Sequence, residues 1–149
     1  MNLNRVLLRY RVHARSLTQA EWSGMDGHAA RIAARELVVL GMPTGDRDIQ
    51  FHRNVGRGGC FQVLRQEELH RAEQWLHALM DANRCTGRYP EKVFRKIVAG
   101  VWFKVCYHAG ALGTAMLSRY TMSALRRSRH TSAKEWLALG LVALRGRSV

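Results

Sequence analysis

The 149-residue sequence predicts an all-α protein, a small helical domain that contains a C-terminal helix-turn-helix. Apolar residues in its longest segments recur three and four positions apart, which is the spacing of one helix face. Gly41-Met42-Pro43 and the stretch from Asn83 to Tyr89 separate these segments as turns. Near the C-terminus, two short helical patterns flank a polar stretch, and the second pattern is rich in arginine. That layout is typical of a helix-turn-helix that reads DNA.

The composition describes a folded chain with an unusual charge. Apolar residues make up 47% of the sequence and charged residues 23%, so the chain can bury a core and is not a disordered tail. Its length leaves room for one domain, or for one domain with a small appendage. The formal net charge of +13 favours a polyanionic partner, most often nucleic acid and in some proteins an anionic membrane surface.

The positive charge is concentrated in the C-terminal half. Residues 84–149 contain thirteen Lys and Arg against two Glu, which gives +11, whereas residues 1–83 contain eleven Arg against nine acids, which gives +2. The half that carries the helix-turn-helix pattern therefore carries the positive field. We expect residues 66–149 to form a helix-turn-helix domain, and residues 1–65 to form an N-terminal region of helices and loops with no assigned role.

One clear helix is expected in the N-terminal region. Residues 3–15 fit a short amphipathic helix but are also compatible with a strand, and residues 16–27 fit a linker. The clear helix begins at Asp26 or Gly27, and its core-facing residues are Ile32, Leu37, Val38 and Leu40.

Two stronger helices are expected after a loop. Residues 44–60 are predicted to form that loop, or a weak hairpin, and their glycines lack the lysine and Ser or Thr of a P-loop. Residues 63–84 form a helix with one apolar stripe, Leu69, Ala72, Trp75, Leu76 and Leu79. Three acids are placed off that stripe, as a solvated face or as a contact for a basic protein: Glu67, Glu68 and Glu73. Residues 90–109 form the next helix, whose inward residues are Val93, Phe94, Ile97, Val98, Val101, Trp102, Val105 and Cys106.

The helix-turn-helix itself is expected between residues 109 and 139. Its first helix is marked by Ala109, Leu112, Ala115 and Met116. Residues 118–121 interrupt that pattern as a turn. Ser123 can then cap the second helix, whose inner face is formed by Leu125, Ser128, Ser132, Trp136 and Leu139.

Other classes of protein find little support in the sequence. Cys60, Cys85 and Cys106 form no CxxC pair, and the start of the chain has no secretory signal, which indicates reduced thiols in a cytoplasmic protein. The most apolar window, residues 97–117, contains a lysine and a histidine, so buried helices are expected there and not a membrane span. The seven histidines show no spacing that completes a metal site, and neither a cofactor motif nor a catalytic motif indicates an enzyme.

Several of these features occur together in one family. They are a helix that begins at Pro90, Tyr107 followed by Gly110, a helix of small residues, a turn ending in Ser123, and an arginine-rich helix closing with residues 133–137. The pattern resembles region 4 of sigma-70-type factors. More specifically, it resembles the small helical late-gene antitermination proteins of lambdoid phages, the Q type of phage 21 and related prophages. The resemblance covers about residues 66–142, and it departs from the family at Thr121, where a turn glycine is usual, and at Arg126-Arg127, where a core residue is common.

The resemblance implies a transcription regulator that needs no catalysis. Such a protein binds double-stranded DNA near a phage late promoter in the cytoplasm of the bacterial host. It then engages RNA polymerase with its sigma factor and stays with the enzyme past terminators. Candidate polymerase contacts are the three acids Glu67, Glu68 and Glu73.

Nine residues are the candidate DNA contacts. In a helix-turn-helix, the first turns of the second helix meet base edges, where the arginine fork pairs with guanine, and the first helix and the turn contact phosphates. The candidates are Thr114, Ser118, Arg119, Thr121, Ser123, Arg126, Arg127, Arg129 and His130. These arginines could also be a plain solvated basic face. The alternative function is a phage-encoded or mobile-element inhibitor that binds a nucleic-acid-binding complex and uses its charge to mimic or block a nucleic-acid site.

Overall fold

The computed structural model describes residues 22–57 and 65–146. The regular secondary structure of these residues is helical. Within these residues there is no strand, so the predicted all-α class is confirmed. The expectations for residues 3–15 and 16–21, and for Cys60, lie outside the described residues. In chain order the elements are α2 (Trp22–Leu40), α3 (Asp46–Arg57), α4 (Gln66–Thr86), α5 (Glu91–His108), the 3-10 helix η1 (Gly110–Leu112), α6 (Thr114–Met122), the 3-10 helix η2 (Ala124–Ser128) and α7 (Ala133–Arg145).

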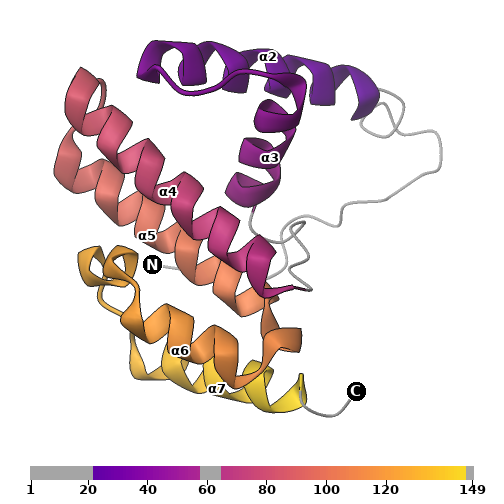
Figure 1. Cartoon of the computed structure of the whole chain (residues 1–149), viewed down its shortest axis with the longest axis vertical. Helices are drawn as coiled ribbons and strands as arrows, with labels where there is room; N and C mark the ends of the chain where they lie inside the picture. Colours follow the sequence, from indigo (N-terminus) through magenta and orange to yellow (C-terminus); the bar gives the residue numbers. More distant parts are fainter. Residues whose placement is uncertain (1–21, 58–64, 147–149) are drawn as a thin grey trace, which may run out of the picture.

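α4 and α5 form the central pair, with α2 and α3 on one side of it and α6 and α7 on the other (Figure 1). Local chemistry sets the ends of this pair. Glu68 accepts a hydrogen bond from the backbone N–H of Arg65 at 3.1 Å, and α4 ends where Gly87 adopts a left-handed φ of 62°. The buried side chain of Asn83 then closes the turn, because it accepts from the Tyr89 N–H at 2.8 Å and donates to the Tyr89 carbonyl at 3.1 Å.

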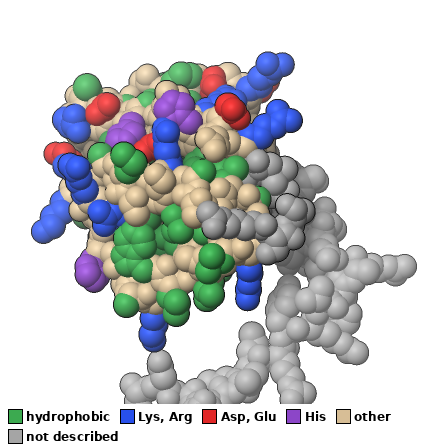
Figure 2. Space-filling model, turned by 60° about the horizontal axis from the view of Figure 1, so that its bottom comes forward, with side chains coloured by type: hydrophobic (Ala, Val, Ile, Leu, Met, Phe, Trp, Pro, Cys, Tyr) green, Lys and Arg blue, Asp and Glu red, His purple; other side chains and the backbone are tan. Residues whose placement is uncertain are grey.

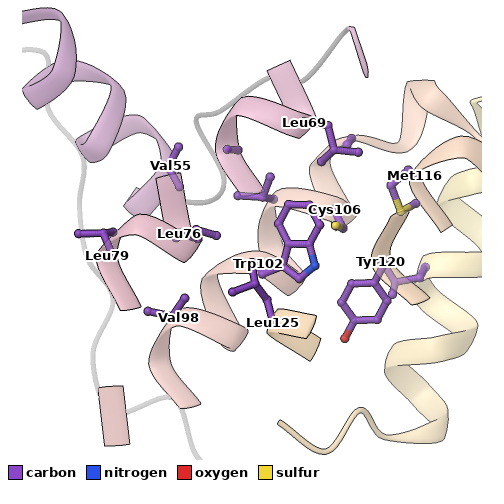
Figure 3. Close-up of a cluster of buried hydrophobic side chains, with 14 of the residues drawn as sticks. Val55, Leu69, Leu76, Leu79, Val98, Trp102, Cys106, Met116, Tyr120 and Leu125 are labelled. Atoms are coloured by element: carbon purple, nitrogen blue, oxygen red, sulfur yellow. The ribbon is translucent and has the colours of Figure 1, made fainter. Parts of the chain in front are cut away.

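Trp102 of α5 is fully buried in the core, which Figure 3 shows in close-up. It belongs to one cluster of buried side chains that also includes Val55 of α3, Leu76 of α4 and Tyr120 of α6. Truncation of such a residue costs about 3–5 kcal/mol. The cluster contains residues from both sides of position 65, so the described helices of the N-terminal region share a core with those that follow.

The predicted apolar stripe of α4 is confirmed, whereas the predicted inner faces of α2 and α5 are partly wrong. Ile32 and Val38 of α2 are exposed, as are Val93 and Ile97 of α5. α2 lies at the edge of the fold, where its main helix contacts are with α3 and α4, so a narrow part of its surface is buried. α2 also begins at Trp22, before the predicted start at Asp26 or Gly27.

α3 occupies Asp46–Arg57, within the stretch 44–60 whose glycines indicated a loop or weak hairpin, so that prediction is wrong for these described residues. The helix begins after Gly45, whose carbonyl accepts the backbone N–H groups of Asp48 and Ile49. Asp46 and Asp48 lie in the first turn, where negative charge stabilises the helix dipole. Ile49, His52 and Val55 are spaced three residues apart, and this helical spacing outweighs a glycine at the helix end.

The C-terminal part differs from the expected helix-turn-helix. Residues 118–121, predicted as a turn, lie inside α6. The predicted continuous helix from Ser123 to Leu139 is wrong, because η2 ends at Ser128 and α7 begins at Ala133. The connection between α6 and α7 therefore spans residues 123–132, which is longer than the three- or four-residue turn of a helix-turn-helix. A helix-turn-helix is not confirmed.

A capping box fixes the start of α7. The Ser132 hydroxyl accepts from the Glu135 backbone N–H at 3.3 Å, and the Glu135 carboxylate accepts from the Ser132 N–H at 2.9 Å. Both groups satisfy backbone donors that a helix N-terminus leaves without intrahelical partners. This arrangement commits residue 132 to the helix boundary, so the arginines before it lie outside α7.

Candidate nucleic-acid interface

A group of basic side chains lies where the first half of α5 meets η2. Lys92, Arg95 and Lys96 are exposed at positions i, i+3 and i+4 of α5, so they share one face of the helix. Arg127 of η2 is also exposed, and it lines the same shallow depression as Lys92 and Arg95, with a volume of about 540 Å³. We call these four residues the cationic surface.

The cationic surface is held in place by contacts between α5 and η2. Arg95 Nε donates to the Ser128 hydroxyl at 3.3 Å, and its Nη1 lies 3.5 Å from Glu91 one helical turn earlier. Lys92, Lys96 and Arg127 form no ion pair with another described residue. Four cations against the single acid Glu91 leave a local charge of +3 on a surface that can meet a polyanion.

Three of the candidate DNA contacts share one exposed stripe of α6. Thr114, Ser118 and Thr121 lie at positions i, i+4 and i+7, and all three are exposed. The Thr121 hydroxyl donates to the Ser118 carbonyl at 2.8 Å, so it is partly satisfied within its own helix. Small hydroxyls of this kind can donate to phosphate oxygens.

Arg119 and Glu73, predicted as a DNA contact and a partner contact, instead pair with each other. Arg119 Nε donates to the Glu73 carboxylate at 2.5 Å, and Glu73 is only 8% exposed. Arg119 also contacts the His70 ring. The placement of Glu73 off the apolar stripe of α4 is therefore wrong, since it lies in the interface between α4 and α6.

Ser123 is buried and serves as a cap. Its hydroxyl accepts from the backbone N–H of Leu125 at 3.3 Å, so it stabilises the start of η2. The expectation that Ser123 caps a helical element is confirmed, although that element is a short 3-10 helix.

Two arginines of the connection are tied to the protein. Arg129 forms an ion pair with Glu135, and its guanidinium lies 4.8 Å from the centre of the Phe103 ring. The pKa of Glu135 is lowered, mainly by the backbone hydrogen bond from Ser132 and also by Arg129. Arg126 is half-buried and lies 5.7 Å from the centre of the Trp136 ring. Of the four basic residues predicted on the second helix, Arg127 and His130 are the exposed ones.

The two remaining acidic candidates lie at the start of α4. Glu67 and Glu68 are both exposed in its first turn. The Glu68 carboxylate accepts a hydrogen bond from the Arg65 backbone N–H and so caps the helix. The Glu67 carboxylate takes no part in that cap.

The sequence interpretation overlooked the cations of α5. Three of them lie at positions i, i+3 and i+4 of the segment Lys92-Val93-Phe94-Arg95-Lys96. This spacing predicts one cationic face of the helix. Two of the apolar residues that were predicted to face inward beside these cations, Val93 and Ile97, are exposed. The capping box at Ser132 and Glu135 was also readable as S-x-x-E and marks the true start of α7.

An apolar groove of about 570 Å³ lies among α2, α3, α4 and α5. The polar side chains on its wall already have partners in the structure. His52 Nδ1 accepts from Trp75 Nε1 at 3.2 Å, and the Glu36 carboxylate accepts from the Tyr89 hydroxyl. The groove therefore offers few groups that could orient a polar ligand.

No three His, Cys, Asp or Glu side chains in the described part of the chain gather as a metal site would require. None of the described helices combines the length and the hydropathy needed to cross a bilayer. Cys106 is buried, and burial raises the pKa of its thiol, whereas Cys85 is an exposed free cysteine.

Comparison with known proteins adds no relative. No protein-family model matches the sequence, and no curated protein or solved structure is significantly similar to it. The resemblance to late-gene antitermination proteins therefore stays a prediction from the sequence pattern.

Proposed function

We propose that the protein binds double-stranded DNA through the cationic surface and acts as a transcription regulator. The observation that carries the proposal is the grouping of Lys92, Arg95 and Arg127 around one shallow depression whose lining holds a single acid, with Lys96 exposed on the same face of α5. Phosphate neutralisation by such cations releases condensed counterions, and this supplies most of the affinity of non-specific binding.

Arg127 is the candidate for reading bases on this surface. It is exposed on η2, within the connection before α7, and no described side chain forms an ion pair with it. Lys92 and Lys96 are point charges on flexible stems, which suits them to phosphates. The hydroxyls of Thr114, Ser118 and Thr121 are proposed as additional backbone contacts on α6.

The transcriptional role rests on the resemblance to late-gene antitermination proteins. In this proposal, the protein binds near a late promoter, engages RNA polymerase with its sigma factor and travels with it. Glu67 and Glu68 are the acidic residues proposed to contact the polymerase, since both are exposed. Glu73 is no longer a candidate because Arg119 neutralises it in the interior.

Salt-dependent binding to a labelled mixed-sequence duplex of about 30 base pairs tests the proposal. The variant pair Lys92→Gln/Lys96→Gln removes two charges from the cationic surface. We expect its affinity to fall at least about tenfold, and the slope of log affinity against log salt to fall by about 2, as for two lost phosphate contacts. The matched control Lys104→Gln/Arg145→Gln removes the same charge from other exposed positions and should change both quantities much less.

Two results would count against the proposal. One is an absence of binding by the unaltered protein at low salt. The other is an equal loss of affinity in both double variants, because net charge alone would then explain binding. Selection of binding sites from a random duplex pool then separates a sequence-reading protein from a general polyanion binder.

A protein-binding inhibitor is the second candidate function. It is favoured by the outward face of α7, which exposes three leucines and has the features of a protein-contact surface. If the protein binds no DNA at low salt, the protein-binding inhibitor is the candidate function that remains.

A further inference from the structure

The outward face of α7 is apolar along most of its length. Leu137, Leu141 and Leu144 are 66%, 48% and 61% exposed, and they lie at positions i, i+4 and i+7 of the helix. Hydrophobic side chains gather on the face of the molecule that Figure 2 turns forward, the end of the fold formed by α6 and α7 in Figure 1. The small residues Ala133, one turn before Leu137, and Gly140, between Leu137 and Leu141, lie on the same face. We call these three leucines and two small residues the α7 stripe.

The α7 stripe lies on a firmly anchored helix. The opposite face of α7 buries Leu139 and Ala143 in the core, and the capping box of Ser132 and Glu135 holds its first turn. At its last turn, Gly146 packs against the backbone of η1. The stripe is therefore presented by a helix that is already formed, which lowers the entropy cost of docking.

The stripe has room for a second helix. A Cβ atom added at Gly140 would meet no heavy atom within 4 Å, so the backbone there is open to close approach. Ala133 is exposed one turn before Leu137 and is equally small. Exposed leucines flanked by small residues provide the ridge and groove that helix packing requires.

The charges beside the stripe are all positive. On a helical wheel with 3.6 residues per turn, Lys134 and Arg145 fall next to Leu141, and both are exposed. The single acid of α7, Glu135, lies on the opposite side and is held by Ser132 and Arg129. A partner docked on the stripe therefore meets cations along one edge and no exposed acid of α7.

We propose that the α7 stripe docks an amphipathic helix of another protein, one whose apolar residues are bordered by Asp or Glu. This partner complements both the leucines and the two flanking cations. A second copy of this chain fits poorly, because it would bring Lys134 and Arg145 of two copies together on chains of net charge +13. The proposal involves a different surface from the cationic surface, so it does not depend on DNA binding.

Fluorescence anisotropy with a designed peptide tests the proposal on the full chain. The probe is a labelled helical peptide of about 18 residues with leucines at i, i+4, i+7 and i+11 and glutamates beside them, the pattern of helix-in-groove ligands. A second peptide has the same composition in scrambled order, and a third has lysines in place of the glutamates. We expect the first peptide to bind at least about tenfold more tightly than either of the others.

Variants of the stripe provide the second arm. Leu137→Gln/Leu141→Gln should weaken binding of the acidic peptide at least about tenfold, and Lys134→Glu/Arg145→Glu should shift the preference to the lysine peptide. The matched control is Val38→Gln on α2, an equally exposed apolar position that should leave peptide binding unchanged. Because all these side chains are exposed, thermal unfolding should confirm that each variant is folded.

Three results would overturn the proposal. They are equal binding of the ordered and scrambled acidic peptides, equal effects of the stripe variant and Val38→Gln, and a dimer in analytical ultracentrifugation that Leu137→Gln/Leu141→Gln dissociates. The last result would assign the stripe to a second copy. Duplex binding by Leu137→Gln/Leu141→Gln should match that of the unaltered protein, so failure of this proposal is distinguishable from failure of the proposed DNA binding.

Discussion

The carboxylate of Glu73 in α4 accepts a hydrogen bond from Arg119 Nε in α6 at 2.5 Å, across 46 residues of sequence. Glu73 is 8% exposed, so this charge lies inside the interface between the two helices. A buried carboxylate is costly unless it is paired and hydrogen-bonded, and the arginine meets both needs. The pair fixes the position of α6 against the central helices.

Loss of one partner of this pair should destabilise the fold. Arg119→Met leaves the Glu73 carboxylate without its cation, and we expect the free energy of unfolding to fall by about 2 kcal/mol. The double variant Arg119→Met/Glu73→Leu removes both charges and should recover part of that loss. Urea denaturation measures the three values, and additive losses would show that the two side chains act independently.

Gly110 should not tolerate a side chain, whereas Gly100 should. A Cβ atom at Gly110 would overlap the Val142 side chain and lie 3.2 Å from the Val142 carbonyl oxygen, so Gly110→Ala pushes α7 away from η1. We expect a loss of about 1–3 kcal/mol, as for an overpacked core position. Gly100→Ala, inside α5 with no atom within 4 Å of the new Cβ, should instead stabilise by up to about 1 kcal/mol. Thermal denaturation of both variants tests this opposite pair of signs.

The hydroxyls of Tyr120 and Thr131 lie 2.7 Å apart in the interior and connect α6 to the segment before α7. Tyr120→Phe leaves the Thr131 hydroxyl without this partner and should lower stability by about 1 kcal/mol. Thr131→Val should cost a similar amount. The double variant should lose clearly less than the sum of the two, and a fully additive loss in chemical denaturation would mean that the hydrogen bond contributes nothing.

His52 should make stability depend on pH. Burial lowers its pKa below the ordinary value of 6.5, so the unfolded chain takes up this proton more readily than the folded protein. Stability is therefore kept above pH 6.5 and declines as the pH falls below that value toward the pKa of the folded state. Denaturation at about pH 7.5 and about pH 5.5 should show this decline, and His52→Gln should reduce it. The exposed His130→Gln is the control, and an unchanged decline in His52→Gln would contradict the assignment.

Arg127 and Arg129 should separate binding from stability. Arg127→Ala removes an exposed cation and should weaken duplex binding with little change in the free energy of unfolding. Arg129→Ala removes the ion pair with Glu135 and the contact with the Phe103 ring, so it should lower the melting temperature. Binding titrations and thermal scans on both variants check the contrast, and a destabilised Arg127→Ala would contradict it.

Several helices could be predicted from the local sequence pattern. The apolar stripe of α4 follows from spacing alone, since Leu69, Ala72, Leu76 and Leu79 recur with the helical period and are all buried. Pro90 and Glu91 mark the start of α5, and the all-α class follows from the same periodicity. Two predictions were wrong where local signals conflicted. The glycines of residues 44–60 indicated a loop although the apolar spacing within α3 is helical, and a continuous helix was predicted although Ser132 and Glu135 form a capping box.

The sequence by itself determined the helical class, the central helices and the concentration of positive charge in the C-terminal half, because periodicity and charge are properties of neighbouring residues. Only the tertiary structure decided that Arg119 and Arg129 are neutralised by Glu73 and Glu135, while Lys92 and Arg127 remain exposed. It also decided that the leucines of α7 face outward. The physical reason is that pairing and burial depend on which elements meet in space, and two side chains 46 residues apart carry no mark of their contact in the chain.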